Sequence, residues 1–480
     1  MIKKIFEKYR VMSIVARATL WFLICSIVQK GFVFVTTPIF TRLMTTEQYG
    51  QYTIYLSWVQ ILTMITSFRL DYAVFNKGMS KYEEDKNNYT LSMQMVTTII
   101  TIIVFIIYLV FHNLINKFTE LTTPLTILMF VQVFFMNAVT FWTIKQRYDF
   151  KYRSVVIVTI LLTVLDVLLG VILVVNCDNK GIARIISLAS VQIIIGCIIY
   201  IYNISKGNKL LNLKYAIFAI SFNIPLIPHY MSMYVLEQSD KIMIQKMVGI
   251  DKAGIYSVAY SIGNAMNIVT NSITQAMTPW LYKNLKENNI KEIKGKLSSI
   301  FLFIIAIVSI FILFVPEFLK IIASDEYYEA IYVISPISVS IFFTLVYGFF
   351  ATIEFYFDKN KFAMIISGLA AVIKILLNLI FIPLFGYQVA GYTTMICYVI
   401  LAIGHVIYTN SIVKKQIKQK FFSNKYIIGL VIFISFVMMV ANFLYKFIWQ
   451  RYIIILIIFL IIFIKRDKIK NLFKFINKKI

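Results

Sequence analysis

SVVIVTILLTVLDVLLGVILVVN, residues 154–176, is an apolar run in which Asp166 is the single ionisable residue. A helix needs about 20 apolar residues to cross the ~30 Å hydrocarbon core of a bilayer, so this run predicts a membrane-spanning helix. Similar runs fill most of the chain, and together with this one their approximate bounds are 13–41, 50–74, 90–111, 122–144, 154–176, 182–203, 215–236, 254–280, 297–315, 330–352, 362–384, 389–412, 426–445 and 449–464. The sequence therefore predicts an all-α polytopic membrane protein with about fourteen transmembrane helices.

Lys and Arg residues gather in every second gap between these runs. Of the 47 basic residues, 33 lie in the two tails and the alternate gaps, whereas 10 lie in the remaining gaps or within the first three residues of the span that follows. Because short loops rich in Lys and Arg stay in the cytoplasm, we expect both termini on that side. This topology accounts for most of the net charge of +25, and no nucleic-acid-binding motif accompanies it. We therefore expect the basic C-terminal tail to contact cytoplasmic-leaflet phospholipid, with no nucleic-acid partner.

The composition also limits the class of protein. Hydrophobic residues make up 60% of the chain and charged residues 14%, whereas about a quarter of a soluble domain is charged. The four cysteines show no ligand spacing, so neither a metal site nor a disulfide framework is expected. The gaps are too short for a folded soluble domain, a phosphate-binding loop or a large catalytic loop. We therefore expect a membrane protein that is not an enzyme.

An internal repeat divides the chain. RLMTTEQYGQYT, starting at Arg42, aligns with KMVGIDKAGIYS, starting at Lys246, and polar positions in the following runs continue the match. Two copies of six spans share the same orientation in the membrane, because six is an even number. We expect an N-lobe at 1–212, a C-lobe at 213–415, and a third segment at 416–480 that holds the last two spans and a basic tail. A substrate cavity is expected between the lobes.

Polar side chains follow single helix faces in the first two spans of each lobe. Their spacing of three, four or seven residues is that of one face of an α-helix, which predicts a wet cavity. For individual Ser and Thr residues the alternative is a hydrogen bond that holds neighbouring helices together. Pro38, Pro225 and Pro228 indicate bends in the first and seventh spans. The cavity-lining candidates are Gln60, Asn264, Asn267, Asn271 and Gln275.

Ionisable residues inside spans need a physical reason, because placing one at the bilayer centre costs at least about 2.5 to 3.5 kcal/mol. Lys30 is the strongest candidate, since it lies too far along its helix from Arg17 to share the same membrane edge. Lys374 and Asp166 lie near the middle of corresponding spans, which makes a state-dependent ion pair between the lobes a hypothesis. For Arg17 and Arg69, near cytoplasmic ends, the alternative is a side chain that reaches the headgroups.

Further ionisable residues lie at span ends. His229 follows a proline in the seventh span, and the ordinary pKa of histidine lies near neutrality, although a hydrogen-bonded packing role is an alternative. Glu237, Asp240 and Lys241 mark the expected outer end of that span, where they form either a gate or an exposed cluster. For Glu354, near a cytoplasmic end, a carboxylate that reaches the headgroups is expected at least as readily as a functional role.

Three segments carry a resemblance to a known family. They are TPIFTRLMTTEQYGQYTIYLSWVQ from Thr37, DKIMIQKMVGIDKAGIYSVAYSI from Asp240 and PLFGYQVAGYTTMI from Pro383. In this order they resemble the oligosaccharide flippases of bacterial polysaccharide biosynthesis, within the multidrug/oligosaccharidyl-lipid/polysaccharide (MOP) superfamily. The resemblance covers nearly the whole chain. It implies two lobes that, by alternating access, carry an undecaprenyl-pyrophosphate-linked oligosaccharide repeat unit from the inner to the outer leaflet.

The resemblance also implies a location, partners and site residues. It places the chain in the bacterial cytoplasmic membrane, where capsule, O-antigen or exopolysaccharide synthesis supplies a lipid-linked oligosaccharide substrate and a polymerase with chain-length machinery as partners. The cationic cavity described for such flippases is matched by Lys30 and more weakly by Arg17, Arg69 and Lys374. No cofactor is implied beyond a coupling ion, H⁺ or Na⁺, for which Asp166 is the deep carboxylate.

Three alternatives stay open at this point. A multidrug or small-cation exporter shares the fold, and an apolar, acidic-centred pocket would favour it. A peptidoglycan-precursor flippase belongs to the same superfamily. A membrane polysaccharide polymerase or ligase is a different class of protein, and the short gaps disfavour it because its chemistry usually occupies a long external loop.

Overall fold

The computed structural model describes residues 14–359, 361–419 and 421–464, and every regular element in these ranges is a helix. The chain divides into two compact units, Met1–Tyr234 and Val235–Ile480. The division falls inside helix α10 (Ile227–Met247). Compactness and internal repetition are different properties, so the lobe boundaries expected from the repeat remain predictions.

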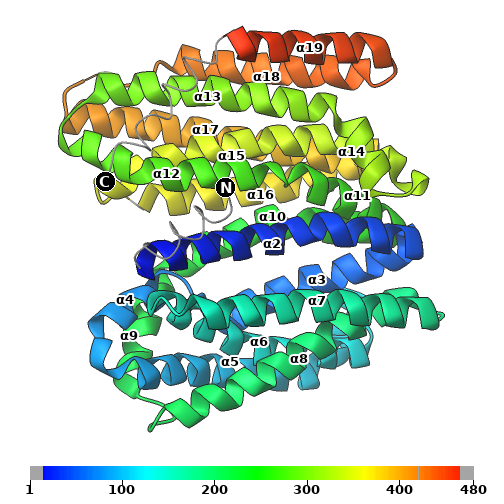
Figure 1. Cartoon of the computed structure of the whole chain (residues 1–480), viewed down its shortest axis with the longest axis vertical. Coiled ribbons are helices and arrows are strands. Elements are labelled where there is room, and N and C mark those ends of the chain that lie inside the picture. The colour runs from blue at the N-terminus through cyan, green and yellow to red at the C-terminus, as the bar shows by residue number, and fades with distance from the viewer. Residues whose placement is uncertain (1–13, 360, 420, 465–480) are drawn as a thin grey trace, which may run out of the picture. The chain divides into compact units, whose positions relative to one another are not determined.

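Unit 1 packs around helix α8 (Lys180–Lys206). Its other helices are α2 (Ile14–Leu43), α3 (Thr46–Ser67), α4 (Ala73–Lys81), α5 (Lys86–Thr119), α6 (Thr123–Tyr148), α7 (Tyr152–Asn176) and α9 (Leu213–Asn223), with 3₁₀ turns η1 (Glu83–Asp85) and η2 (Ile224–Leu226). Helix α8 contacts α3, α5, α6 and α7, and α2 packs against α7 (Figure 1). These contacts bring the polar faces of α3, α7 and α8 together.

Unit 2 is centred on helix α15 (Ile331–Tyr356). Its other elements are most of α10, then α11 (Ile250–Gly263), α12 (Met266–Lys286), α13 (Ile290–Leu313), α14 (Val315–Ile322), η3 (Asp325–Ala330), α16 (Lys361–Phe385), α17 (Val389–Gln416), α18 (Asn424–Leu444) and α19 (Ile448–Ile464). Helix α15 contacts α11, α12, α13, α17 and α18, while α19 packs beside α13 and α18 at one edge of the unit (Figure 1).

The TTEQ sequence at the start of α3 explains where this helix begins. Thr45 Oγ1 accepts a hydrogen bond from the Gln48 backbone N–H at 3.3 Å, and Gln48 Oε1 accepts one from the Thr45 N–H at 3.2 Å. This reciprocal pair satisfies two backbone donors that a helix start otherwise leaves free. Gly181, in the first turn of α8, lies against the same turn, because a Cβ there would be 2.9 Å from the Gln48 carbonyl oxygen. The glycine therefore permits the close approach of α8 to α3.

Among the described residues, ten helices are long and apolar enough to cross a membrane, judged by length and composition. Helix α7 is typical, because most of its apolar side chains face outward, as lipid contact requires. Helix α15 is the opposite case, since 83% of its apolar window is buried inside the protein. The other expected spans coincide with α2, α3, the α11 and α12 pair, and α19. A multi-pass membrane protein is therefore shown, and the count of fourteen spans remains a prediction.

Two expected spans differ in the structure from the continuous helices that the sequence suggests. Helix α3 ends at Ser67, because Phe68 and Arg69 both have positive φ, so residues 68–72 interrupt the helix expected over 50–74. The eighth span is interrupted at Asn264, where α11 ends, and α12 begins at Met266. The expected bend in the seventh span is confirmed as the 3₁₀ turn η2. Helix α2, in contrast, continues through Pro38.

The charge-based topology makes a prediction that labelling can test. We expect cysteines introduced at Lys81, Lys291 and Lys418, in a Cys177→Ser chain, to escape a membrane-impermeant maleimide added to intact cells, because these sites lie in the basic, cytoplasmic loops. Native Cys177 is exposed in a loop of the opposite class and is the positive control. Strong labelling at two of the three sites would reject the topology.

Candidate functional site

The sharpest departure from helical geometry in unit 1 follows α3. Phe68 and Arg69 have φ values of 52° and 51°, in the left-handed region. Each non-glycine residue held there costs about 1–3 kcal/mol, and such residues cluster at functional sites. Two in succession turn the chain away from the axis of α3, which places the Arg69 side chain beyond the end of the helix.

A second helix break lies against the first. Helices α9 and α10 are separated by the turn that contains Pro225, which cannot donate a helical hydrogen bond. Asn223, the last residue of α9, is fully buried, and its Nδ2 donates to the carbonyl oxygens of Phe68 at 2.9 Å and Arg69 at 2.7 Å. These carbonyls lie past the end of α3, where helical partners are missing. Asn223 thus holds the strained end of α3 against the break between α9 and α10.

The Arg69 guanidinium lies among three tyrosine rings. Its Cζ is 5.0 Å from the ring centroid of Tyr72 and 5.4 Å from that of Tyr230. It is 5.9 Å from the centroid of Tyr234, whose hydroxyl accepts a hydrogen bond from Nη1 at 3.2 Å. These distances lie within the range of cation–π attraction. Asp71 Oδ2 is 3.7 Å from Nη1, and we call these five residues the Arg69 cluster.

The Arg69 cluster is partly open to solvent. The Arg69 and Asp71 side chains are 22% and 19% exposed, so solvent reaches both. Their Nε and Oδ1 atoms are buried and have no hydrogen-bond partner among the described residues. Tyr72 is 55% exposed, although Arg69 lies over its ring. A guanidinium fork suits phosphate oxygens, and exposed aromatic rings add flat apolar contact area. The cluster can therefore bind an anionic group and a flat polar ring beside it.

Sequence reasoning identifies part of this cluster. It predicts Arg69 and His229 as separate candidates, and the structure connects them through Tyr230, whose ring centroid is 5.8 Å from that of His229. It does not identify the tyrosines or Asn223. One available signal is the spacing of Tyr230 and Tyr234, which lie one helical turn apart after a double-proline bend.

A second charged centre in unit 1 joins α7 to α8. Arg184 donates from Nη1 to Asp166 Oδ1 at 2.5 Å and from Nη2 to Oδ2 at 2.8 Å, a bidentate pair. Nη2 also lies 3.3 Å from the Tyr52 hydroxyl, and the arginine side chain is 3% exposed. The guanidinium packs over the rings of Phe40 at 4.3 Å and Tyr52 at 4.8 Å. Asp166 is therefore paired inside its own unit, with an arginine that the charge-based topology counts as a loop residue.

Unit 2 holds a buried ion pair between α10 and α16. Lys374 Nζ lies 2.8 Å from Asp240 Oδ2 and also donates to the Leu236 carbonyl oxygen. The two side chains are 0% and 1% exposed. The carboxylate accepts three further hydrogen bonds, from Asn378 at 2.7 Å, Thr394 at 2.8 Å and Tyr256 at 2.6 Å. Both carboxylate oxygens are thus satisfied, and the lysine charge compensates that of the aspartate.

These two pairs change how the candidates are grouped. Asp166 and Lys374 each meet an opposite charge inside their own unit, so a state-dependent pair between them remains a hypothesis. Asp240 is a core residue of unit 2, so it does not belong to an exposed cluster, and its role in a gate remains a prediction. Asp240 and Glu354 are further buried carboxylates, both in unit 2.

The predicted polar stripe of unit 2 lies on one side of the break between α11 and α12. Asn267 Nδ2 donates to Asn264 Oδ1 across this break. Both residues are half-buried, whereas Asn271 and Gln275 are exposed on α12, and the opposite face of α12 is buried. In unit 1, Gln60 is exposed on α3. The stripe therefore lies away from the core of unit 2, and its role in lining a cavity remains a prediction.

The remaining candidates are dispersed. The Lys30 side chain lies outside the described residues, although its backbone belongs to α2. Arg17 is half-buried on the same helix. Glu237 is exposed, and the Lys241 ammonium lies 5.2 Å from the ring centroid of Tyr260 in unit 2. Their proposed roles in binding, gating or coupling remain predictions.

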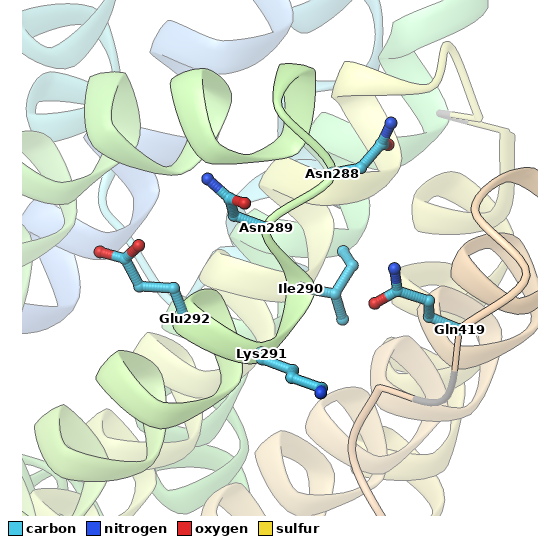
Figure 2. Close-up of a pocket in the computed structure, with 6 residues that line it drawn as sticks. All are labelled: Asn288, Asn289, Ile290, Lys291, Glu292 and Gln419. Carbon is cyan, nitrogen blue, oxygen red and sulfur yellow. The ribbon is translucent and has the colours of Figure 1, made fainter.

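Unit 2 also contains a surface pocket away from these centres. Figure 2 shows its lining residues at the turn between α12 and α13, opposite Gln419 from the segment that follows α17. Its volume is about 550 Å³, and its lining residues are Asn288, Asn289, Ile290, Lys291, Glu292 and Gln419. None of the site residues predicted from the sequence lines it. Within the described residues, no group of His, Cys, Asp and Glu side chains is arranged to hold a metal ion.

Comparisons with solved structures place the fold. Lipid II flippase MurJ, in an inward closed conformation, superposes with a TM-score of 0.69 at 14% identity, over 94% of this chain and 100% of that chain. An inward-facing multidrug resistance MATE family transporter of the MOP superfamily gives 0.61 at 11% identity, over 82% and 96%. A MOP superfamily transporter from Pyrococcus furiosus gives 0.55 at 12% identity, over 83% and 96%. At these identities the likeness shows a shared transporter fold.

The family follows from a match along the sequence itself. No curated protein matches the chain significantly. A family model described as "Polysaccharide biosynthesis protein" matches residues 15–285, more than half of the 480 residues. This range contains the Arg69 cluster and both members of the Arg184–Asp166 pair. The chain therefore belongs to the polysaccharide biosynthesis protein family, with the fold of MOP superfamily transporters.

Proposed function

We propose that this protein is a flippase that moves an undecaprenyl-pyrophosphate-linked oligosaccharide repeat unit from the inner to the outer leaflet of the bacterial cytoplasmic membrane. The polysaccharide biosynthesis family and the transporter fold support this class of substrate. A pyrophosphate and a chain of sugar hydroxyls cannot cross hydrocarbon unaided, because unpaired polar and charged groups are too costly there. The protein shelters this head while the prenyl tail stays in lipid.

The Arg69 cluster is the observation that carries the proposal. The Arg69 side chain is partly exposed and lies at the end of a helix among tyrosine rings. The cation offsets phosphate charge, and the exposed part of Tyr72 can contact a sugar ring. Lys30 is proposed as a second cation for the pyrophosphate, together with the exposed amides of α12 for the sugars.

The proposed function is tested in proteoliposomes that contain the full-length protein. The probe is an undecaprenyl-pyrophosphate-linked disaccharide, and the readout is its accessibility to a membrane-impermeant glycosidase outside the vesicle. We expect faster exposure of this probe than in protein-free vesicles. Export of ethidium instead would favour a multidrug exporter, and a rate confined to lipid II would favour a peptidoglycan-precursor flippase. Exposure at the protein-free rate would reject flipping of this probe.

We expect Arg69→Ala to reduce the flipping rate about ten- to a hundredfold at normal protein level. A hydrogen bond to a charged group contributes about 1.5–3 kcal/mol, and about 1.4 kcal/mol corresponds to a factor of ten. Arg69→Lys should retain part of the rate, because charge remains but the planar fork is lost. Arg42→Ala is the matched control, since Arg42 is exposed and donates to Pro38 of its own helix. Equal rates for Arg69→Ala and Arg42→Ala would remove Arg69 from the site.

A further inference from the structure

Unit 2 buries a carboxylate and an imidazole outside the proposed substrate site. Glu354, in the last turn of α15, is 0% exposed, and His405 of α17 is 2% exposed. His405 Nδ1 lies 3.0 Å from both carboxylate oxygens of Glu354. The expectation that Glu354 reaches the headgroups is therefore wrong, because its carboxylate points into the unit and meets a titratable partner there.

The surroundings of this pair leave its charge unbalanced. From α17, Thr409 donates to Glu354 Oε1 at 3.0 Å. From α15, the Tyr347 phenol ring stacks on His405 at 5.6 Å, and from α16 the uncharged Phe362 ring meets its edge at 5.7 Å. Other elements pack aromatic rings against residues of α15 that neighbour Glu354. Phe301 of α13 and Phe422, which precedes α18, contact Phe350. Tyr282 of α12 contacts Tyr356. Among the described residues, His405 is the one cationic partner of Glu354.

Proton number then decides whether the pair is neutral. With one proton on the imidazole and none on the carboxylate, the buried pair carries a net charge of −1. A second proton makes the pair neutral, whichever group holds it. Burial in a low-dielectric interior disfavours the charged form. A net charge on the pair is therefore better tolerated in an arrangement that admits water than in the closed one.

The Glu354–His405 pair lies close to the end of α15, next to the first turn of α16. Helix α15 ends at Tyr356, two residues after Glu354, and Asp358 then has a φ of 55°. The first turn of α16 covers His405 through Phe362, whose ring stacks on Tyr408 at 4.1 Å. Gly404 permits this cover, because a Cβ there would lie 2.9 Å from Ile366 Cδ1. This turn is therefore the part of α16 that covers the imidazole, and Tyr347 of α15 covers it from another side.

We propose that Glu354 and His405 form a proton-binding site that is filled when the first turn of α16 is closed and emptied when it opens. This inference rests on the proposed function: the coupling ion of the flippase is the proton that this site binds. A proton moves from water to the pair and back, and no other bond changes. Proton occupancy biases the two arrangements because their proton affinities differ.

The test separates proton binding from transport. Infrared difference spectra between pH 8 and pH 5 are recorded on purified full-length protein. We expect a protonation band that Glu354→Gln and His405→Gln both lose. Glu354→Asp and Thr409→Val should keep the band, with a shifted midpoint for Thr409→Val, because both titratable groups remain. Glu329→Gln is the matched control, since this carboxylate pairs with Lys252 at the surface of the same unit. A band unchanged in a folded Glu354→Gln variant would overturn the proposal.

The coupling is measured in proteoliposomes with an imposed pH gradient and the undecaprenyl-pyrophosphate disaccharide. We expect the wild-type rate to change severalfold with the gradient, and the rates of Glu354→Gln and His405→Gln to become independent of it. A purely structural pair would lower the rate without altering its dependence on the gradient. That outcome would overturn the coupling. If the probe is not flipped while the protonation band that depends on Glu354 and His405 persists, the proposed substrate is rejected and the proton-binding site is retained.

Discussion

Asp240→Asn is expected to prevent accumulation of folded protein in the membrane, whereas the double change Asp240→Asn with Lys374→Met is expected to restore most of it. The single change leaves the Lys374 ammonium buried without a countercharge. Removing one partner of a buried pair costs about 3–5 kcal/mol, a large part of a total stability of about 5–15 kcal/mol. Replacing both charged partners of a buried pair by uncharged residues often leaves the stability unchanged, so the double variant is the informative one.

The measurement is the yield and thermal midpoint of detergent-solubilised protein, followed by fluorescence-detected size exclusion. Lys252→Ala is the control, because its pair with Glu329 is largely exposed and contributes little. An Asp240→Asn variant as stable as wild type would contradict the stabilising role of the buried Asp240–Lys374 pair. If the double variant folds but does not transport, the pair has a role beyond stability.

Arg184→Ala is expected to lower the free energy of unfolding by about 3–5 kcal/mol, because it leaves Asp166 without its bidentate partner in a largely buried place. Arg184→Lys should not rescue it fully, since an ammonium cannot reproduce two parallel hydrogen bonds and stacking over Phe40 and Tyr52. The thermal midpoint of the purified variants, compared with Arg42→Ala, measures this effect.

The same pair decides the role of Asp166. If it only holds α7 to α8, Asp166→Asn reduces stability and leaves the sodium and pH dependence of transport unchanged. That is the outcome we expect, since both carboxylate oxygens are already occupied by Arg184. A changed ion dependence in a folded Asp166→Asn variant would instead return Asp166 to the coupling site.

Much of the helical pattern can be predicted from the sequence, because each span is a local apolar run. The bend at Pro225 and the helix start at Thr45 also follow from local chemistry, since a missing N–H and a capping pair involve neighbours in the chain. The end of α3 does not, because Phe68 and Arg69 are not residue types that usually adopt positive φ. Asn223, from a distant helix, stabilises that turn.

Partners of buried charges are equally hard to predict. The sequence places Asp240 in a polar run with Glu237 and Lys241, and only the packing of α10 against α16 shows that it meets Lys374. Glu354 lies at the expected end of a span, and only its rotation toward α17 shows that it meets His405. Depth along a helix is a one-dimensional property, whereas the direction of a side chain around the helix depends on its neighbours.

The charge balance within each of the two buried ion pairs has an electrical consequence. One elementary charge moved across a membrane potential of 100 mV changes the energy by about 2.3 kcal/mol. Arg184 with Asp166, and Lys374 with Asp240, each sum to zero charge when both partners are ionised. A displacement that carries either pair as a whole through the membrane field therefore does no net electrical work. These two centres are then electrically silent, and voltage sensitivity of the transport cycle comes from the cargo, the coupling ion and the other charged groups that move.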